Sequence, residues 1–136
     1  MSDPTAFTVV TRYRVDDLDA WLPAAREALA PLARQELCLG ADICAAIDDA
    51  HLALIVTRWP SIGAYRRAMS AFDVKMHTVP MLSQSIDEPT SFEVLHHHGP
   101  DGIVDSVSAR AHDADTVDLG GAAAEYVRPR LAPDSQ

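Results

Sequence analysis

The order of strand-like and helix-like repeats constrains this chain more than any other feature of its sequence. Residues 7–15 and 51–59 distribute their side chains over two faces in the two-residue period of a strand. Elsewhere apolar side chains recur at spacings of three and four, which indicates helices. The predicted elements in chain order are a strand at 7–15, a helix at 17–36, strands at 41–47 and 51–59, a helix at 62–76 and a strand at 90–98.

Three prolines complicate the two predicted helices. Pro23 and Pro31 lie inside the first one. Each removes an amide donor and crowds the carbonyl four residues back, at about 3 kcal/mol in a regular helix interior. We therefore expect the first helix to start late, to kink, or both. Pro80 is expected to end or bend the second helix.

The order β-α-β-β-α-β predicts an α+β fold of the ferredoxin-like type, with both helices on one face of a four-stranded antiparallel sheet. Both faces of this sheet carry apolar side chains, because Val9 and Val10 point in opposite directions, as do Leu54 and Ile55. Two helices cover only one face. We therefore predict a homodimer in which the second faces of two copies pack together, and the alternative is a monomer whose tail folds back across the sheet.

Length and composition predict one core followed by a C-terminal extension. A chain of 136 residues with 48% hydrophobic side chains is long enough for one modest core. Beyond residue 98 the sequence is dominated by Ala, Asp, Gly, Pro and Ser. We expect a domain at 1–98 and an extension at 99–136 that is flexible or clasps a partner, with a short strand at Ile103, Val104 and Val107 as an option.

The charge excludes whole classes of partner. The net charge is −9, from 11 basic and 20 acidic side chains, which argues against nucleic acid and against an anionic membrane surface. No apolar run is long enough to span a bilayer, and no signal segment is recognisable, so a cytoplasmic protein is expected. Cys38 and Cys44 are expected to be free thiols.

Three consecutive histidines close the last predicted strand, and Gly99 and Pro100 follow them. In a regular strand His96 and His98 share one face and His97 lies on the other, so all three cannot bind one metal ion. Two of them can, if His112 or an aspartate of the extension completes the site. We nevertheless expect no metal here, and interpret the run as the point where the strand leaves the sheet.

Residues 38–72 and 86–96 resemble the antibiotic biosynthesis monooxygenase (ABM) superfamily of dimeric α+β barrels. The resemblance rests on Cys38 to Gly40 entering the second strand, on Trp59 closing the third and on Pro89 before the fourth. It covers about residues 7–97. It implies a cofactor-independent monooxygenase that acts on a small aromatic or polyketide-like phenol or enol, without any bound cofactor.

The resemblance also suggests site residues. Trp59 would form a pocket wall, and Tyr65, six residues later, would donate a proton; the alternative is that both are ordinary core aromatics. His77 is the candidate base, and the alternative is an exposed histidine near a helix end without a role. The expected substrate contacts are Arg12 and Arg58, as anchors for an anion, and Met69 and Phe72, on the same helical stripe as Tyr65; the alternative for the arginines is solvation at the rim or a salt bridge of the dimer.

Two departures from the family pattern favour other functions. Ile55 stands where the phenol-oxidising members have an asparagine, and Met69 stands where the haem-degrading members have an iron-binding histidine. A non-catalytic, dimeric small-molecule-binding module is therefore the alternative function. A haem-binding or haem-degrading protein is disfavoured.

Overall fold

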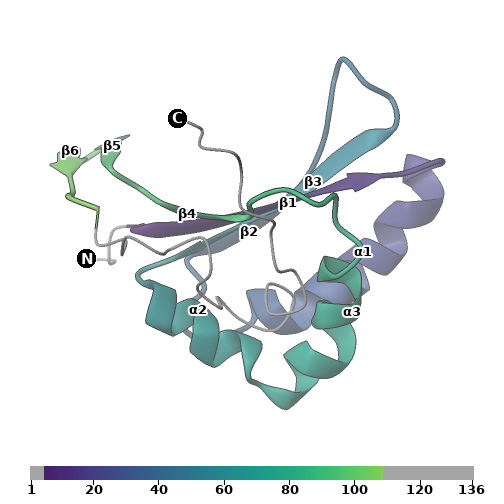
Figure 1. The fold of residues 1–136 in the computed structure, drawn as a ribbon, viewed down its shortest axis with the longest axis horizontal. Coiled ribbons are helices and arrows are strands. Elements are labelled where there is room, and N and C mark those ends of the chain that lie inside the picture. The colour runs from purple at the N-terminus through teal and green to yellow at the C-terminus, as the bar shows by residue number, and fades with distance from the viewer. Residues whose placement is uncertain (1–4, 109–136) are drawn as a thin grey trace, which may run out of the picture.

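The computed structural model describes residues 5–108 and has two layers, a four-stranded antiparallel sheet with the helices on one side (Figure 1). Its elements are β1 (Phe7–Arg14), α1 (Leu18–Ala33), β2 (Gly40–Ala45), β3 (Leu52–Trp59), α2 (Ile62–Met69), the π-helix η1 (Val74–Thr78), α3 (Val79–Leu82), β4 (Ser91–Glu93), β5 (His96–Gly99) and β6 (Gly102–Asp105). The strand order is β2-β3-β1-β4, and β5 and β6 form a separate hairpin. The predicted α+β, ferredoxin-like fold is confirmed.

The core lies between the sheet and the helices. Along β1 and β3 every second residue is buried, and the register from Phe7 opposite Trp59 to Arg14 opposite Leu52 places the buried side chains of both strands on the helical side. The intervening side chains, such as Val10 and Val56, are only half-buried. The single core follows from this alternation, and it packs against Leu29, Leu32 and Met69 of the helices.

Helix α1 does not start late. The Asp17 carboxylate accepts hydrogen bonds from the amides of Asp19 and Ala20, and this cap fixes the start at Leu18. Neither Pro23 nor Pro31 interrupts the helix, which runs to Ala33. Burial of its apolar face against the sheet offsets the amide donors that the two prolines remove.

The second predicted helix is three shorter segments, α2, η1 and α3. The stripe of buried residues holds as far as Met69 and then fails, since Phe72 is 74% exposed and Met76 54%. A π turn contains more residues than an α turn, so it rotates later positions away from the face they would otherwise share. Val74 and Thr78 occupy the buried face instead. Pro80 lies in the first turn of α3 and does not end the helical region.

The last predicted strand is also divided. β4 pairs with β1 over only three residues, and Val94 then donates to the Ala6 carbonyl before the chain leaves the sheet. The histidines belong to the β5–β6 hairpin, which crosses the domain boundary expected at residue 98. Its second strand contains Ile103 and Val104 but ends at Asp105, before Val107 of the expected short strand. Gly102 has a φ of +123°, a conformation that favours glycine in its turn. The rest of the expected extension, residues 109–136, lies outside the described residues.

No helix in residues 5–108 is both long enough and apolar enough to cross a bilayer.

Candidate active site

An aromatic cluster forms where β3 ends and α2 begins. Trp59, the last residue of β3, is fully buried, and the Tyr65 ring packs against its edge with 5.5 Å between the ring centroids. Phe7, opposite Trp59 on β1, lies 5.7 Å from Tyr65 by the same measure. Ser61 caps α2 by accepting from the Ala64 amide, which sets where the helix starts and so where Tyr65 lies. The six-residue spacing therefore brings Trp59 and Tyr65 together.

The polar atoms of this region differ in whether they have partners. The Trp59 indole Nε1 donates to the Thr57 hydroxyl at 2.9 Å. Tyr65 is 2% exposed, and no residue in the described part of the chain forms a hydrogen bond with its hydroxyl. Burial, and secondarily Tyr13, raise the pKa of Tyr65 well above its ordinary value. Its phenol is therefore neutral at physiological pH and able to donate a proton.

Tyr13 is a second buried phenol, with different surroundings. Its hydroxyl is 2.9 Å from the Thr11 hydroxyl, and its ring packs against Trp21 at 5.4 Å between centroids. Burial raises the pKa of Tyr13 to about 12, and the hydrogen bond with Thr11 partly opposes that rise. Tyr13 thus has a partner that Tyr65 lacks.

The other predicted site residues do not gather around this cluster. His77 is exposed on η1, and Phe72 is also exposed. Arg12 and Arg58 lie on the sheet face away from the helices, where they pair with Glu88 at 3.2 Å and with Asp42 at 2.8 Å. Met69 is buried in the core that contains Trp59 and Tyr65.

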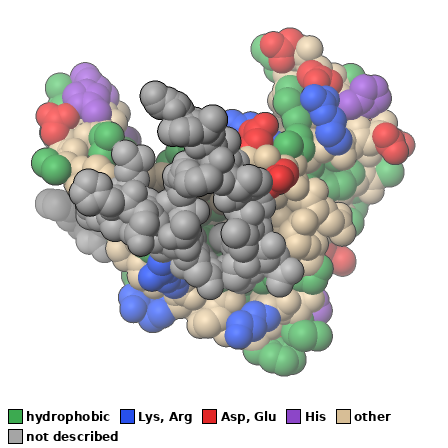
Figure 2. All heavy atoms as spheres, viewed as in Figure 1, with side chains coloured by type: hydrophobic (Ala, Val, Ile, Leu, Met, Phe, Trp, Pro, Cys, Tyr) green, Lys and Arg blue, Asp and Glu red, His purple; other side chains and the backbone are tan. Residues whose placement is uncertain are grey.

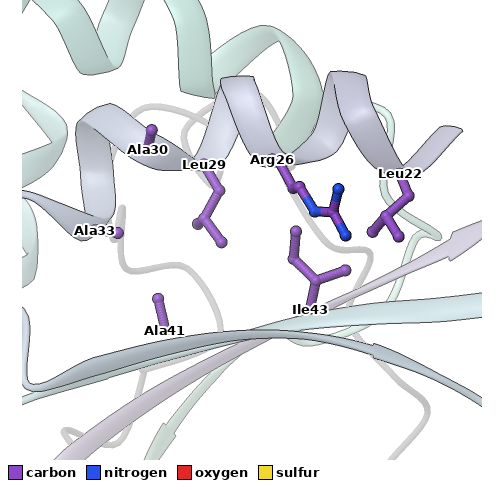
Figure 3. Close-up of a pocket in the computed structure, with 7 residues that line it drawn as sticks. All are labelled: Leu22, Arg26, Leu29, Ala30, Ala33, Ala41 and Ile43. Atoms are coloured by element: carbon purple, nitrogen blue, oxygen red, sulfur yellow. The ribbon is translucent and has the colours of Figure 1, made fainter.

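A groove between α1 and the edge strand β2 was not predicted from the sequence. It measures about 410 Å³. Figure 3 shows it lined by Leu22, Arg26, Leu29, Ala30, Ala33, Ala41 and Ile43, with the Arg26 guanidinium extending over the apolar surface. Small side chains leave the space, and Ala41 lies on a strand that the sequence does not show to be adjacent to the helix of Ala30 and Ala33. The volume lies in the range of small-molecule sites.

The groove borders the same core as the aromatic cluster. Ala41 pairs with Thr57, and Ile43 pairs with Ile55 on β3. Ile55 is 2% exposed, and its side chain offers no hydrogen-bond donor at the position where the family resemblance leads one to expect an asparagine. No group of three or more His, Cys, Asp or Glu side chains within residues 5–108 is arranged to hold a metal ion.

The sequence matches no protein-family model and no curated protein. Solved structures do match. SnoaB of Streptomyces nogalater, a cofactor-independent oxygenase solved as a mutant, aligns with a TM-score of 0.53 at 17% identity, over 78% of this chain and 97% of SnoaB. The protein has the SnoaB fold. The ABM-type fold expected from the sequence is thereby confirmed, whereas an identity of 17% establishes no shared chemistry.

Two further solved structures also match this chain. A conserved protein of unknown function from Bacteroides thetaiotaomicron, described as a possible oxidoreductase, aligns with a TM-score of 0.54 at 15% identity, over 66% of this chain and 98% of its own. PA3566 from Pseudomonas aeruginosa aligns with a TM-score of 0.51 at 16% identity, over 69% and 96%. At these identities the likeness concerns the fold alone.

Proposed function

We propose that the protein is a cofactor-independent monooxygenase that acts on a small aromatic phenol or enol. One observation carries the proposal: Tyr65, whose ring packs against Trp59, is buried, and its hydroxyl has no hydrogen-bond partner in the described part of the chain. A buried polar group without a partner is costly, about 1–3 kcal/mol, and such groups are retained most readily where a ligand completes them. The likeness to SnoaB adds support at the level of fold.

The reaction needs dioxygen as oxidant and the substrate itself as reductant. A CH₂ group made acidic by flanking aromatic or carbonyl groups loses a proton, and the resulting carbanion adds to dioxygen to give a peroxide. Loss of the second C–H proton forms the C=O bond while the O–O bond breaks, and the departing oxygen leaves as water. The balance is CH₂ + O₂ → C=O + H₂O, with four electrons taken from the carbon.

In this reaction Tyr65 donates the proton that the departing oxygen requires. The phenol is protonated at physiological pH, and although its raised pKa makes it a weaker acid than an exposed tyrosine, the departing hydroxide is a stronger base than tyrosinate and can take the proton. Trp59 would supply a flat apolar wall that keeps water from the carbanion; because its ring is fully covered in this structure, the substrate must displace side chains that pack on it. Apart from tyrosine, the buried polar side chains of the described residues are Thr11, Thr57 and Thr78, and none of these is a base. The substrate is therefore one acidic enough to ionise in water before it binds.

Oxygen uptake with a panel of anthrone-like phenols, each with an acidic CH₂ group, tests the proposal. The Tyr65→Phe variant should lose most of the uptake, and Trp59→Phe should reduce it. Tyr13→Phe is the matched control, because it removes a second buried phenol hydroxyl that already has a partner. Equal rates in all variants, equal losses in the two tyrosine variants, or no uptake with any substrate would each overturn the assignment.

The groove favours a second candidate function, a non-catalytic small-molecule-binding module. It is apolar apart from Arg26, so it fits a small aromatic anion. Binding of a fluorescent aromatic sulfonate should weaken about tenfold in Arg26→Gln, the loss of one charged contact. Arg34→Gln is the control, since Arg34 is exposed just beyond the same helix and does not line the groove. Unchanged binding in Arg26→Gln would reject the groove as the site.

A homodimer through the open face of the sheet is part of the proposal. Val10 pairs with Val56 across β1 and β3 on that face, and Leu54 lies between Arg12 and Cys44. Phe92 of β4, which is 43% exposed, extends the same face beside Thr8. If the same face of a second copy packed against it, these apolar side chains would be removed from water, although no helix of the described residues covers them.

A further inference from the structure

The β5–β6 hairpin holds its histidines in a defined arrangement. It projects from one end of the sheet, and its histidine side chains gather there (Figure 1, Figure 2). His96 pairs with Asp105 and His98 with Ile103, so His96, His98 and Asp105 share one face of the hairpin. His97 belongs to the other face, where its ring lies over Gly99: a Cβ built on Gly99 would be 2.9 Å from His97 Nε2.

The two imidazoles on the shared face are spaced as two ligands of one ion would be. Their ring centroids are 4.7 Å apart, with 63° between the ring planes. With metal–nitrogen bonds of about 2.0–2.1 Å, each ring centre lies roughly 3.2 Å from the ion, and bond angles of about 90–110° place the two centres roughly 4.5–5.2 Å apart. The observed separation falls within that interval.

Asp105 determines which nitrogen of His96 is left for a ligand. Its carboxylate is bonded to His96 Nδ1, so Nε2 remains free. Carboxylates on the far nitrogen of a metal-binding histidine orient the ring and make it more basic, and their loss typically weakens metal binding tenfold to a hundredfold. The net charge of −9 also favours cations over anions near the protein.

We propose that His96 and His98 chelate one divalent transition-metal ion at the hairpin, with Asp105 orienting His96. Imidazole nitrogens favour zinc, nickel and copper over magnesium or calcium. Because no three-ligand group exists among the described residues, water occupies the remaining positions, and the site is open and exchangeable. The proposal is independent of the oxygenase assignment, because the hairpin shares no residue with the aromatic cluster.

Calorimetric titration of the untagged full chain with ZnCl₂ and with NiCl₂ tests this site. Proton NMR then locates the ion, because bound Ni²⁺ broadens the resonances of the imidazoles that hold it. Wild type should bind one ion at the hairpin, and His96→Gln and His98→Gln should each weaken binding at least tenfold. Asp105→Asn should weaken it about tenfold, the lower end of the effect of such partners. His97→Gln is the matched control and should bind as wild type does.

Two results would overturn the proposal. One is wild-type affinity in both His96→Gln and His98→Gln, which would place the ion elsewhere, for example at the two cysteines. The other is an equal loss in His97→Gln, which would mean that any pair of these histidines attracts the ion. All four side chains are exposed, so the variants should keep the thermal midpoint of wild type, and a shared shift in that midpoint would identify a folding defect.

Discussion

The indole nitrogen of Trp59 donates to the hydroxyl of Thr57, two residues earlier on the same face of β3. Both side chains are buried, and this bond satisfies the one donor of the indole ring. The orientation of the Trp59 ring in the core therefore depends on the Thr57 hydroxyl, the one polar group of that side chain.

Replacing Thr57 with valine keeps the shape of the side chain and leaves the indole donor without its partner. The free energy of unfolding should fall by about 1–3 kcal/mol, the cost of an unpaired buried donor. Urea denaturation measures it. Thr8→Val is the control, because it makes the same hydroxyl-to-methyl change on the open face of the sheet. A loss of the same size in both variants would contradict the role of the Thr57 hydroxyl.

The two buried tyrosines should respond oppositely to phenylalanine. Tyr13→Phe removes a hydroxyl that is hydrogen-bonded to Thr11, so the free energy of unfolding should fall by about 1 kcal/mol. Tyr65→Phe removes a hydroxyl with no partner in the described residues, so stability should stay the same or rise. Urea denaturation of the two variants side by side decides the matter. A clear loss in Tyr65→Phe would show that its hydroxyl is hydrogen-bonded after all.

Alkaline pH should destabilise the fold through these same phenols. Burial raises the pKa of Tyr13 from its ordinary 10.0 to about 12, and it also raises the pKa of Tyr65. The folded state therefore holds these protons more tightly than the unfolded state does. Their contribution to stability is complete below pH 10.0 and is lost as the pH rises through 12 and beyond.

Thermal midpoints measured across the alkaline range, together with tyrosinate absorbance, check this expectation. The midpoint should fall as pH rises above the ordinary tyrosine pKa, and tyrosinate should appear together with unfolding. In the Tyr13→Phe, Tyr65→Phe double variant the fall should be shallower. A midpoint that stays constant while tyrosinate absorbance rises would mean that both phenols ionise within the folded protein.

A charge on the open sheet face should separate the two copies of the proposed dimer. Val56→Lys places an ammonium group opposite Val10, where the second copy would bury it. Light scattering coupled to size exclusion should show a dimer for wild type and a monomer for the variant. Phe72→Lys is the control, since Phe72 is an exposed apolar residue of the helical layer. A monomeric wild type would reject the interface.

Features that follow from the spacing of residues along the chain could be predicted from the sequence. Features that depend on contacts between distant segments could not. The alternation of β1 and β3, and the positions of Trp59 and Tyr65 in one core, follow from repeats and spacing within the chain. The exposure of Phe72 does not, because a π turn changes the number of residues per turn without a signal in the hydrophobic pattern.

The remaining misses concern contacts across the fold. The histidines were placed in the last strand of the main sheet, and only the short pairing of β4 with β1 shows where that strand ends. For Arg12 and Arg58 the sequence leaves open an anion anchor or a rim or dimer salt bridge, and in the fold each has a carboxylate neighbour on the open face. The groove arises from alanines on α1 and β2 that lie close only in the folded chain.

The π-helix also affects how this chain is aligned with others. A π turn accommodates one residue more than an α turn, so Val74–Thr78 has the effect of a single inserted residue within a helix. Against a relative whose helix is uninterrupted, an alignment drawn without a gap slips by one position from there onward. Roles transferred by counting from Trp59 are therefore safe as far as Met69, and beyond it they require superposition of the structures.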